Sequence, residues 1–284
     1  QFYVFISKSG NTIETLVNIN LLKFNINRSN SIIISEKKEN SLNELSKKLN
    51  IKLIEHNKYV GGRYSVFSEV GMIPAYLMGL NIKKFKKNIR DIFFKKEKIK
   101  NLINISSKVA NLYLDKKINS LIIFNYSPQL NSFAYWCQQL FAESLGKKGM
   151  GMLPIVSPAP QDHHSLLQLY LDGPKNKIFY ILSSKSLYNL KIKKNYFKKN
   201  HIFLSNLNLE KIVESQRKAF IKVLKEKKIP FREFHVSNFS ENILGELFSY
   251  FMLETALIGS AMKVNPFTQD AVEQVKIITK KNLT

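Results

Sequence analysis

Cysteine and arginine are both scarce in this 284-residue chain. Cys137 is the only cysteine, so no internal disulfide can form. A small secreted domain stabilised by internal disulfides is therefore excluded. Arginine supplies only five of the 44 basic residues. A lone thiol at a core position of its predicted helix fits a reducing compartment, and we expect a cytoplasmic protein.

Negative charge is also in short supply. The 44 basic residues face 21 acidic ones, which leaves a formal net charge of +23. Such a balance often indicates a nucleic-acid or membrane partner. Here the excess is lysine, spread among asparagine and isoleucine as in AT-rich genomes, and zinc-finger or stacked-aromatic patterns are missing. We therefore expect no specific nucleic-acid partner, only a nonspecific attraction to polyanions at low salt.

Long uninterrupted hydrophobic runs are missing as well. The longest apolar stretch, residues 243–262, contains Glu246 and Glu254, so it is predicted to be a buried helix and no membrane partner is expected. The neighbouring His163 and His164 would point in different directions on a helix, so no zinc site is predicted. The chain shows no signal peptide.

The sequence is rich in short apolar runs that alternate with amphipathic helical patterns. Strands are predicted at residues 1–6, 31–35, 51–54, 121–124, 178–182 and 231–236. Helical patterns occur at residues 13–19, 42–49, 66–80, 83–117, 130–145, 164–170, 209–226 and 241–262, with another after residue 269. The Gly- and Pro-rich residues 146–160 are predicted to be a loop. This repeated alternation indicates two tandem α/β domains with mainly parallel sheets.

The loop of residues 7–12, Ser-Lys-Ser-Gly-Asn-Thr, joins the first strand to the first helix. The hydroxyl groups of Ser7, Ser9 and Thr12 would converge there with free backbone N–H groups and the positive end of the helix, and Lys8 adds a point charge. These features favour a phosphate site. The alternative is an ordinary strand-to-helix turn with a Ser/Thr cap.

Two glycines, Gly61 and Gly62, precede Arg63. Paired glycines let the backbone approach a ligand closely, and they place Arg63 at the mouth of the next helix, where it could meet an oxyanion. The alternative is a simple turn with an exposed arginine.

Glu143 and Gln139 lie four residues apart on a predicted helix and therefore share one face. Glu143 falls in the last turn, where the helix dipole disfavours a carboxylate and apolar neighbours surround it, as suits a general base. The alternative is a solvated glutamate that contacts Lys147 or Lys148.

Three further polar residues are candidates. His164 lies near a predicted helix start, where a structural histidine is the ordinary alternative. Gln269 lies in a loop, and Lys276 follows seven residues later, two helical turns along and on roughly the same side.

Five blocks of this chain resemble the glucose-6-phosphate isomerase (phosphoglucose isomerase) family, in the family's order. They are FISKSGNTIET (5–15), GGRYSVFSEVG (61–71), QLFAESLGKKGMG (139–151), HSLLQLYLDG (164–173) and NPFTQDAVEQVK (265–276). The resemblance implies two tandem sugar-isomerase (SIS) domains and a C-terminal helix. We assign residues 1–82 to the C-terminal portion of the first SIS domain, 83–262 to the second SIS domain, and 263–284 to a C-terminal active-site loop and helix.

The resemblance also implies roles for the candidate residues. Glu143 would be the base that moves a proton between C2 and C1, and Arg63 would stabilise a cis-enediolate. His164 would assist ring opening, with Lys276 at the ring end. The remaining residues implied to bind substrate or its phosphate are Ser7, Lys8, Ser9, Thr12, Gly62, Gln139 and Gln269.

A sugar phosphate is the implied substrate, and the implied reaction interconverts glucose 6-phosphate and fructose 6-phosphate in glycolysis and gluconeogenesis. In this family the histidine comes from a neighbouring subunit, so a homodimer with shared sites is implied, with no metal or organic cofactor. The alternative is a non-catalytic SIS module that binds sugar phosphates and regulates a partner. The family's glycine-rich motif before the first block has no counterpart here, so we expect the natural protein to be longer.

Overall fold

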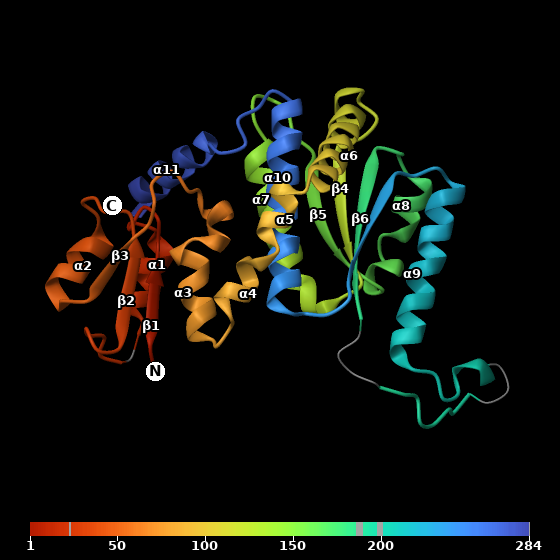
Figure 1. Ribbon diagram of the computed structural model, residues 1–284, viewed down its shortest axis with the longest axis horizontal. Coiled ribbons are helices and arrows are strands. Elements are labelled where there is room, and N and C mark those ends of the chain that lie inside the picture. Colours follow the sequence, from red (N-terminus) through yellow and green to blue (C-terminus); the bar gives the residue numbers. More distant parts are fainter. Residues whose placement is uncertain (23, 186–189, 198–200, 284) are drawn as a thin grey trace.

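Two parallel sheets organise the computed structural model, which describes residues 1–22, 24–185, 190–197 and 201–283 (Figure 1). The first sheet has the order β1-β2-β3, formed by Tyr3–Ile6, Ser31–Ser35 and Lys52–Glu55. The second has the order β5-β4-β6-β7, formed by Leu153–Pro158, Ser120–Asn125, Lys177–Ser184 and Phe231–Val236. Every pairing between these strands is parallel, which confirms the predicted α/β fold class.

The helices fill the connections between these strands. The α-helices are α1 Ile13–Asn20, α2 Ser41–Leu49, α3 Glu69–Leu77, α4 Ile82–Lys87, α5 Ile89–Phe94, α6 Lys96–Leu114, α7 Asn131–Leu145, α8 Leu167–Asp172, α9 Leu209–Glu226, α10 Glu241–Ala261 and α11 Glu273–Leu283. Short 3-10 helices occur at η1 Gly62–Phe67, η2 Pro128–Leu130, η3 Gln161–His163, η4 Ile202–Leu204 and η5 Asp270–Val272. In Figure 1, α11 runs from the end of α10 back towards the first sheet.

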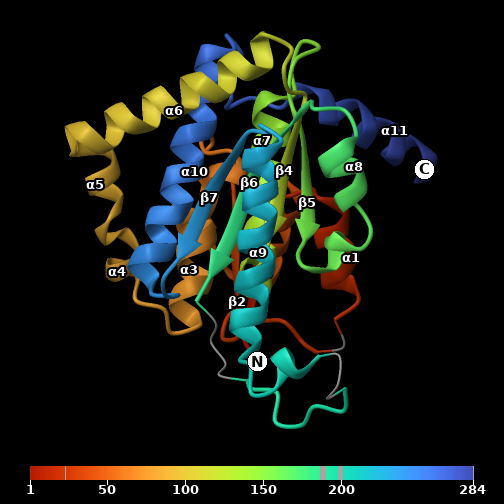
Figure 2. The same cartoon turned by 90° about the vertical axis from the view of Figure 1, so that its right-hand side faces the viewer.

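Side chains of the second sheet alternate between two hydrophobic cores, because successive residues of a strand point to opposite faces. On one face Leu121 and Ile123 of β4 pack with residues of α6, α7 and α10. On the other face Ile122 and Phe124 pack with residues of α8 and α9. Figure 2 shows α9 lying in front of this sheet. Both faces are covered, which explains why the central strands β4 and β6 are continuous apolar runs.

The first sheet has a smaller core. Phe5, Ile33, Leu42 and Ile51 are its buried members, contributed by β1, β2, α2 and the residue before β3. Asn40 caps α2, since its side chain accepts a hydrogen bond from the backbone N–H of Asn43.

One prediction about secondary structure is wrong. Residues 146–160 are not all loop, because β5 occupies Leu153–Pro158. This strand lies at a sheet edge, where its two prolines need not donate to a second neighbour. The helical pattern at residues 83–117 is confirmed, and it is divided into three helices, α4, α5 and α6.

The long apolar helix α10 is buried in protein along much of its length. By length and composition alone it could cross a membrane. Here it packs against α4, α6 and α7, with Phe251 and Ile258 fully buried. The predicted domain boundaries, 1–82, 83–262 and 263–284, remain a prediction.

Candidate functional site

Arg63 is the most deeply placed of the candidate residues, with 1% of its surface exposed. Arg63 follows the paired glycines and is the second residue of η1. The indole Nε1 of Trp136 donates to the backbone carbonyl of Arg63 at 3.0 Å. The alternative of an exposed arginine after a turn is therefore wrong. A buried guanidinium needs partners for its charge and its donors.

The five N–H groups of the Arg63 guanidinium meet five acceptors. Nε donates to Ser144 Oγ at 2.8 Å. One terminal nitrogen donates to Glu143 Oε2 at 3.3 Å and to Gln269 Oε1 at 2.5 Å. The other donates to the carbonyls of Pro266 and Thr268 at 2.7 and 2.8 Å. Arg63 thereby ties η1, the last turn of α7 and the loop of residues 265–269 into one unit.

Glu143 is held at both carboxylate oxygens. Oε2 accepts from Arg63, and Oε1 accepts from Gln139 Nε2 at 2.9 Å, as their shared helical face predicts. Its side chain keeps 28% exposure. The helix end disfavours a negative charge, and the adjacent guanidinium compensates for it. Lys147, one of the two lysines that the alternative places against Glu143, donates to the Asn265 carbonyl.

A cavity of about 500 Å³ opens beside Glu143. Its lining combines the end of α7 with the segment that leaves α10, and includes Gly146, Lys148, Asn265 and Gln269. The volume is in the range of small-molecule sites. A ligand in this cavity would meet a carboxylate, an amide and lysine side chains on otherwise largely apolar walls.

The hydroxyl loop of the first domain has the shape that the sequence predicts. Ser7 Oγ lies 2.7 Å from Thr12 Oγ1 and 3.5 Å from Ser9 Oγ, and it accepts from the Gly10 backbone N–H at 3.1 Å. The Thr12 side chain does not cap α1, so the ordinary Ser/Thr cap is not formed. The three hydroxyl groups thus gather where β1 meets α1.

Lys8 belongs to the same loop but contacts different groups. Its Nζ donates to the carbonyls of Lys58 and Val60 at 2.8 and 3.0 Å, and it lies 3.6 Å from Glu36. Lys8 therefore holds the segment that leads to Arg63. Its phosphate-binding role stays a prediction.

The buried His56 supports that segment from the other side. Its Nε2 lies 3.0 Å from the Val60 carbonyl, and its Nδ1 is hydrogen-bonded to Glu69 at the start of α3. Partial burial would raise the pKa of Glu69, but the hydrogen bond and charge of His56 outweigh it and lower that pKa.

The structure does not bring every predicted residue into one cavity. His164 lies between η3 and α8 and lines a separate cavity with His163 and Gln168. Lys276 lies on α11 with an exposed side chain, three residues beyond the first residue of that helix. A Cβ on Gly62 would meet nothing within 4 Å, so its backbone borders open space. The described part of the chain contains no group of three or more metal-ligating side chains.

Several residues of this site were not predicted from the sequence. Ser144 accepts from Arg63, and the Tyr64 hydroxyl lies 3.0 Å from the same Ser144 oxygen. Burial raises the pKa of Tyr64, so its hydroxyl stays protonated. The only sequence signal for Ser144 was its place beside the candidate base in the last turn of the predicted helix, and its full burial is seen only in the structure.

Sequence comparisons relate this chain to known proteins. The family model described as phosphoglucose isomerase matches residues 1–283. A probable glucose-6-phosphate isomerase from Methanococcus maripaludis is 34% identical over 98% of this chain. A glucose-6-phosphate isomerase from Methanocaldococcus jannaschii is 32% identical over 96% of it. The chain spans 65% and 69% of the lengths of these two relatives.

Solved structures share the fold. A hypothetical protein from Thermus thermophilus superimposes with a TM-score of 0.83 at 25% identity, over all of this chain and 72% of that one. A glucose-6-phosphate isomerase from Chlamydia trachomatis superimposes with a TM-score of 0.79 at 16% identity, over 99% of this chain and 59% of that one. The second likeness supports the fold alone.

Proposed function

Because the chain belongs to the phosphoglucose isomerase family, we propose that the protein to which it belongs interconverts glucose 6-phosphate and fructose 6-phosphate. The observation that carries the proposal is the pairing of a buried Arg63 with a partly exposed Glu143 at 3.3 Å beside a cavity. A binding module needs only the hydroxyl loop. It has no use for a carboxylate fixed between Arg63 and Gln139.

The chemistry requires one base that serves two carbons. The Glu143 carboxylate takes the proton from C2 of the open-chain aldose and returns it to C1, while the hydroxyl proton moves from O2 to O1. No oxidant or reductant is consumed. Between the two transfers the substrate is an enediolate, whose negative charge a guanidinium in a water-poor site stabilises. Arg63 supplies that guanidinium.

Arg63 can act in two ways, since all its donors already have protein acceptors. Its fixed charge stabilises the enediolate at short range without any new hydrogen bond. Alternatively, substrate replaces Gln269 on the shared terminal nitrogen and forms a direct hydrogen bond. Both versions need the loop of residues 265–269 to be in place.

The other roles follow from position and chemistry. Ser7, Ser9 and Thr12, with Lys8 and the Gly62 backbone, bind the phosphate, and Gln139 and Gln269 orient the sugar. His164 assists ring opening, with Lys276 at the ring end. Because His164 lines a different cavity from Glu143, a homodimer in which the partner subunit supplies this histidine completes the site. The enzyme would act in the cytoplasm in glycolysis and gluconeogenesis.

Glu143→Gln tests the proposal on the natural full-length protein. The amide keeps the shape and an acceptor for Arg63 but loses basicity, so turnover in a coupled assay should disappear while sugar-phosphate binding persists. Glu97→Gln, an exposed site at the start of α6, is the matched control and should retain full activity. Unchanged turnover in Glu143→Gln would remove Glu143 as the base. A folded, inactive natural protein that binds sugar phosphate would favour the regulatory module instead.

A further inference from the structure

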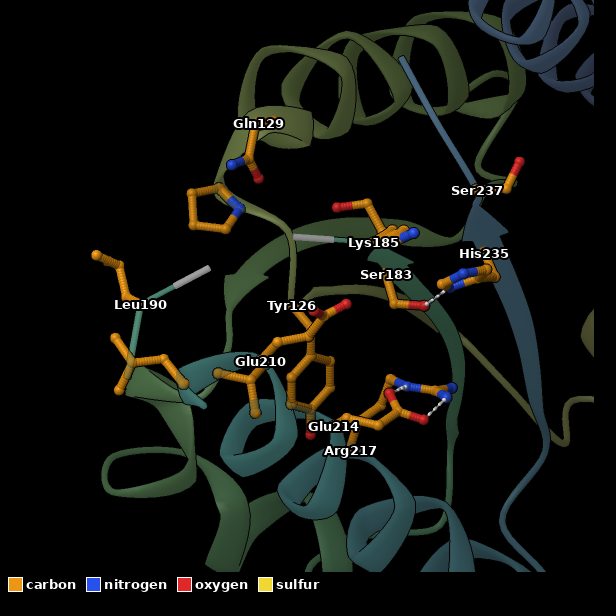
Figure 3. A pocket seen from close by; sticks show the side chains of 14 residues that line it. Tyr126, Gln129, Ser183, Lys185, Leu190, Glu210, Glu214, Arg217, His235 and Ser237 are labelled. Carbon is orange, nitrogen blue, oxygen red and sulfur yellow. Dashed lines mark hydrogen bonds and ion pairs between the residues drawn. The ribbon is translucent and has the colours of Figure 1, made fainter. Parts of the chain in front are cut away.

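A second cavity, of about 530 Å³, lies at the carboxyl edge of the second sheet (Figure 3). This volume is also in the range of small-molecule sites. Its lining residues lie at or just after the carboxyl ends of three neighbouring strands, β4, β6 and β7, and in the first half of α9. Among them are Tyr126, Gln129, Ser184, Lys185, His235 and Glu214.

The cavity lies between β4 and β6, where the direction in which the chain adds strands to the sheet reverses. The chain leaves β4 through α7 towards β5 on one side, and it leaves β6 through α9 towards β7 on the other. The helices α7 and α9 cover opposite faces of the sheet. The crevice outside the carboxyl ends of two such strands is where open α/β sheets bind ligands.

One wall of the cavity presents hydroxyl groups and basic side chains. Ser183 Oγ lies 3.1 Å from Nδ1 of His235, and Ser184 Oγ lies 2.7 Å from Ser127 Oγ. Figure 3 shows Lys185 beside Ser183 and His235. These groups, together, suit an anionic oxygen cluster such as a phosphate or carboxylate group.

The opposite wall, on α9, presents acceptors. Arg217 binds Glu214 through two hydrogen bonds of 2.8 and 2.7 Å, and it donates to Glu233 at 2.6 Å. Two carboxylates thus face the single positive charge of Arg217. A carboxylate has about four acceptor sites, so Glu214 can still accept from ligand hydroxyl groups. Leu209 and Val213 add apolar surface between the polar groups.

The cavity is distinct from the one beside Glu143. Gln129 precedes the first residue of α7, whereas Glu143 lies in its last turn. At 1.5 Å per residue, the two lie about 20 Å apart along that helix. A ligand at one end of α7 cannot contact the catalytic carboxylate at the other.

We propose that this cavity is a second ligand site, which binds a small polyhydroxylated molecule with at least one anionic group. The anionic group binds against Lys185, His235 and the serine hydroxyls. The ligand's own hydroxyl groups donate to Glu214 and contact Gln129. A sugar acid and a sugar phosphate share this chemistry.

The probe is gluconate 6-phosphate, which carries hydroxyl groups and anions but has no carbonyl to isomerise. Its binding to the full-length protein is followed by NMR of the histidine side chains. The His235 signals are identified by their loss in His235→Gln. The fluorescence of Trp136, hydrogen-bonded to Arg63, reports separately on the cavity beside Glu143. Gluconate repeats the titration without phosphate, and inorganic phosphate repeats it without sugar.

The matched variants reverse one charge at either end of β6. The first variant is Lys185→Glu, at the residue that follows the strand's carboxyl end. The second is Lys175→Glu, at a residue that precedes its amino end. Both side chains are exposed, so both variants should fold. We expect the His235 signals to shift on titration, the affinity reported by them to fall about tenfold or more in Lys185→Glu, and no change in Lys175→Glu.

The outcomes separate the two sites. A His235 response that Lys185→Glu weakens supports the second site even if the Trp136 signal is silent and the proposed isomerase fails. Saturable shifts with gluconate alone identify a sugar acid as sufficient. A Trp136 response without any His235 response overturns the second site, as do His235 shifts that are equal in the two lysine variants. A response to inorganic phosphate as strong as to gluconate 6-phosphate would overturn the recognition of hydroxyl groups.

Discussion

Replacing Arg63 by alanine should detach the loop of residues 265–269 from the rest of the site. The guanidinium is 1% exposed and gives fully buried hydrogen bonds to Ser144 and to the Pro266 carbonyl. Leaving a buried acceptor unpaired costs about 1–3 kcal/mol, and breaking a buried ion pair costs about 3–5 kcal/mol. Glu143 is partly exposed, so its ion pair contributes less than that range. We expect a loss of about 3 kcal/mol, a folding equilibrium reduced about a hundredfold.

Urea unfolding measures this loss, with Arg28→Ala as the matched control. Arg28 is exposed before β2, so its removal should cost less than about 0.5 kcal/mol. Chymotrypsin gives a local measurement, since Phe267 is 60% exposed and lies within the loop that Arg63 holds. Cleavage at Phe267 should be faster in Arg63→Ala than in Arg28→Ala. A stability loss below about 1 kcal/mol with unchanged cleavage would refute the structural argument.

The same variant tests the proposed chemistry. Loss of the guanidinium should lower kcat by about 10² or more if it stabilises the enediolate in a water-poor site. A change confined to KM would assign Arg63 to ground-state binding.

Two further predictions concern the supports of the site. Gly10→Ala should destabilise the first domain by about 1–3 kcal/mol, because Gly10 has φ +71° and a Cβ would lie 1.9 Å from Asn40 Oδ1. Gly79→Ala is the control, with a similar φ of +85° and nothing within 4 Å, and an equal loss in thermal unfolding would show that backbone strain alone is responsible. Glu69→Gln should lower the free energy of unfolding above pH 4.5, which is the ordinary pKa of a glutamate, because His56 lowers the pKa of Glu69 in the folded state. The difference in Tm from the natural protein should shrink as pH falls below that value, and a constant difference would contradict the role of charge.

Local sequence was sufficient to predict most elements of the fold. The strands at Ser31–Ser35 and Phe231–Val236 and the helix at Leu209–Glu226 have the predicted bounds. The apolar centre of Ser31–Ser35 agrees with its place between β1 and β3, because a central strand of a parallel sheet is buried on both faces. The strand at Leu153–Pro158 was missed because prolines are typical of loops, and only its place at a sheet edge makes them acceptable.

Some features of the candidate site were likewise predictable from the sequence, and others are visible only in the tertiary structure. The i, i+4 spacing of Gln139 and Glu143 determined that they share a face, and the hydroxyl loop at residues 7–12 follows from a strand that leads into a helix. Only the tertiary structure decided that Arg63 is buried and binds Ser144, Glu143 and the loop at residues 265–269, up to 206 residues away in the chain. Sequence patterns report the periodicity of neighbouring residues. A buried charge is paired by whichever segments the fold brings to it, and no local pattern records that choice.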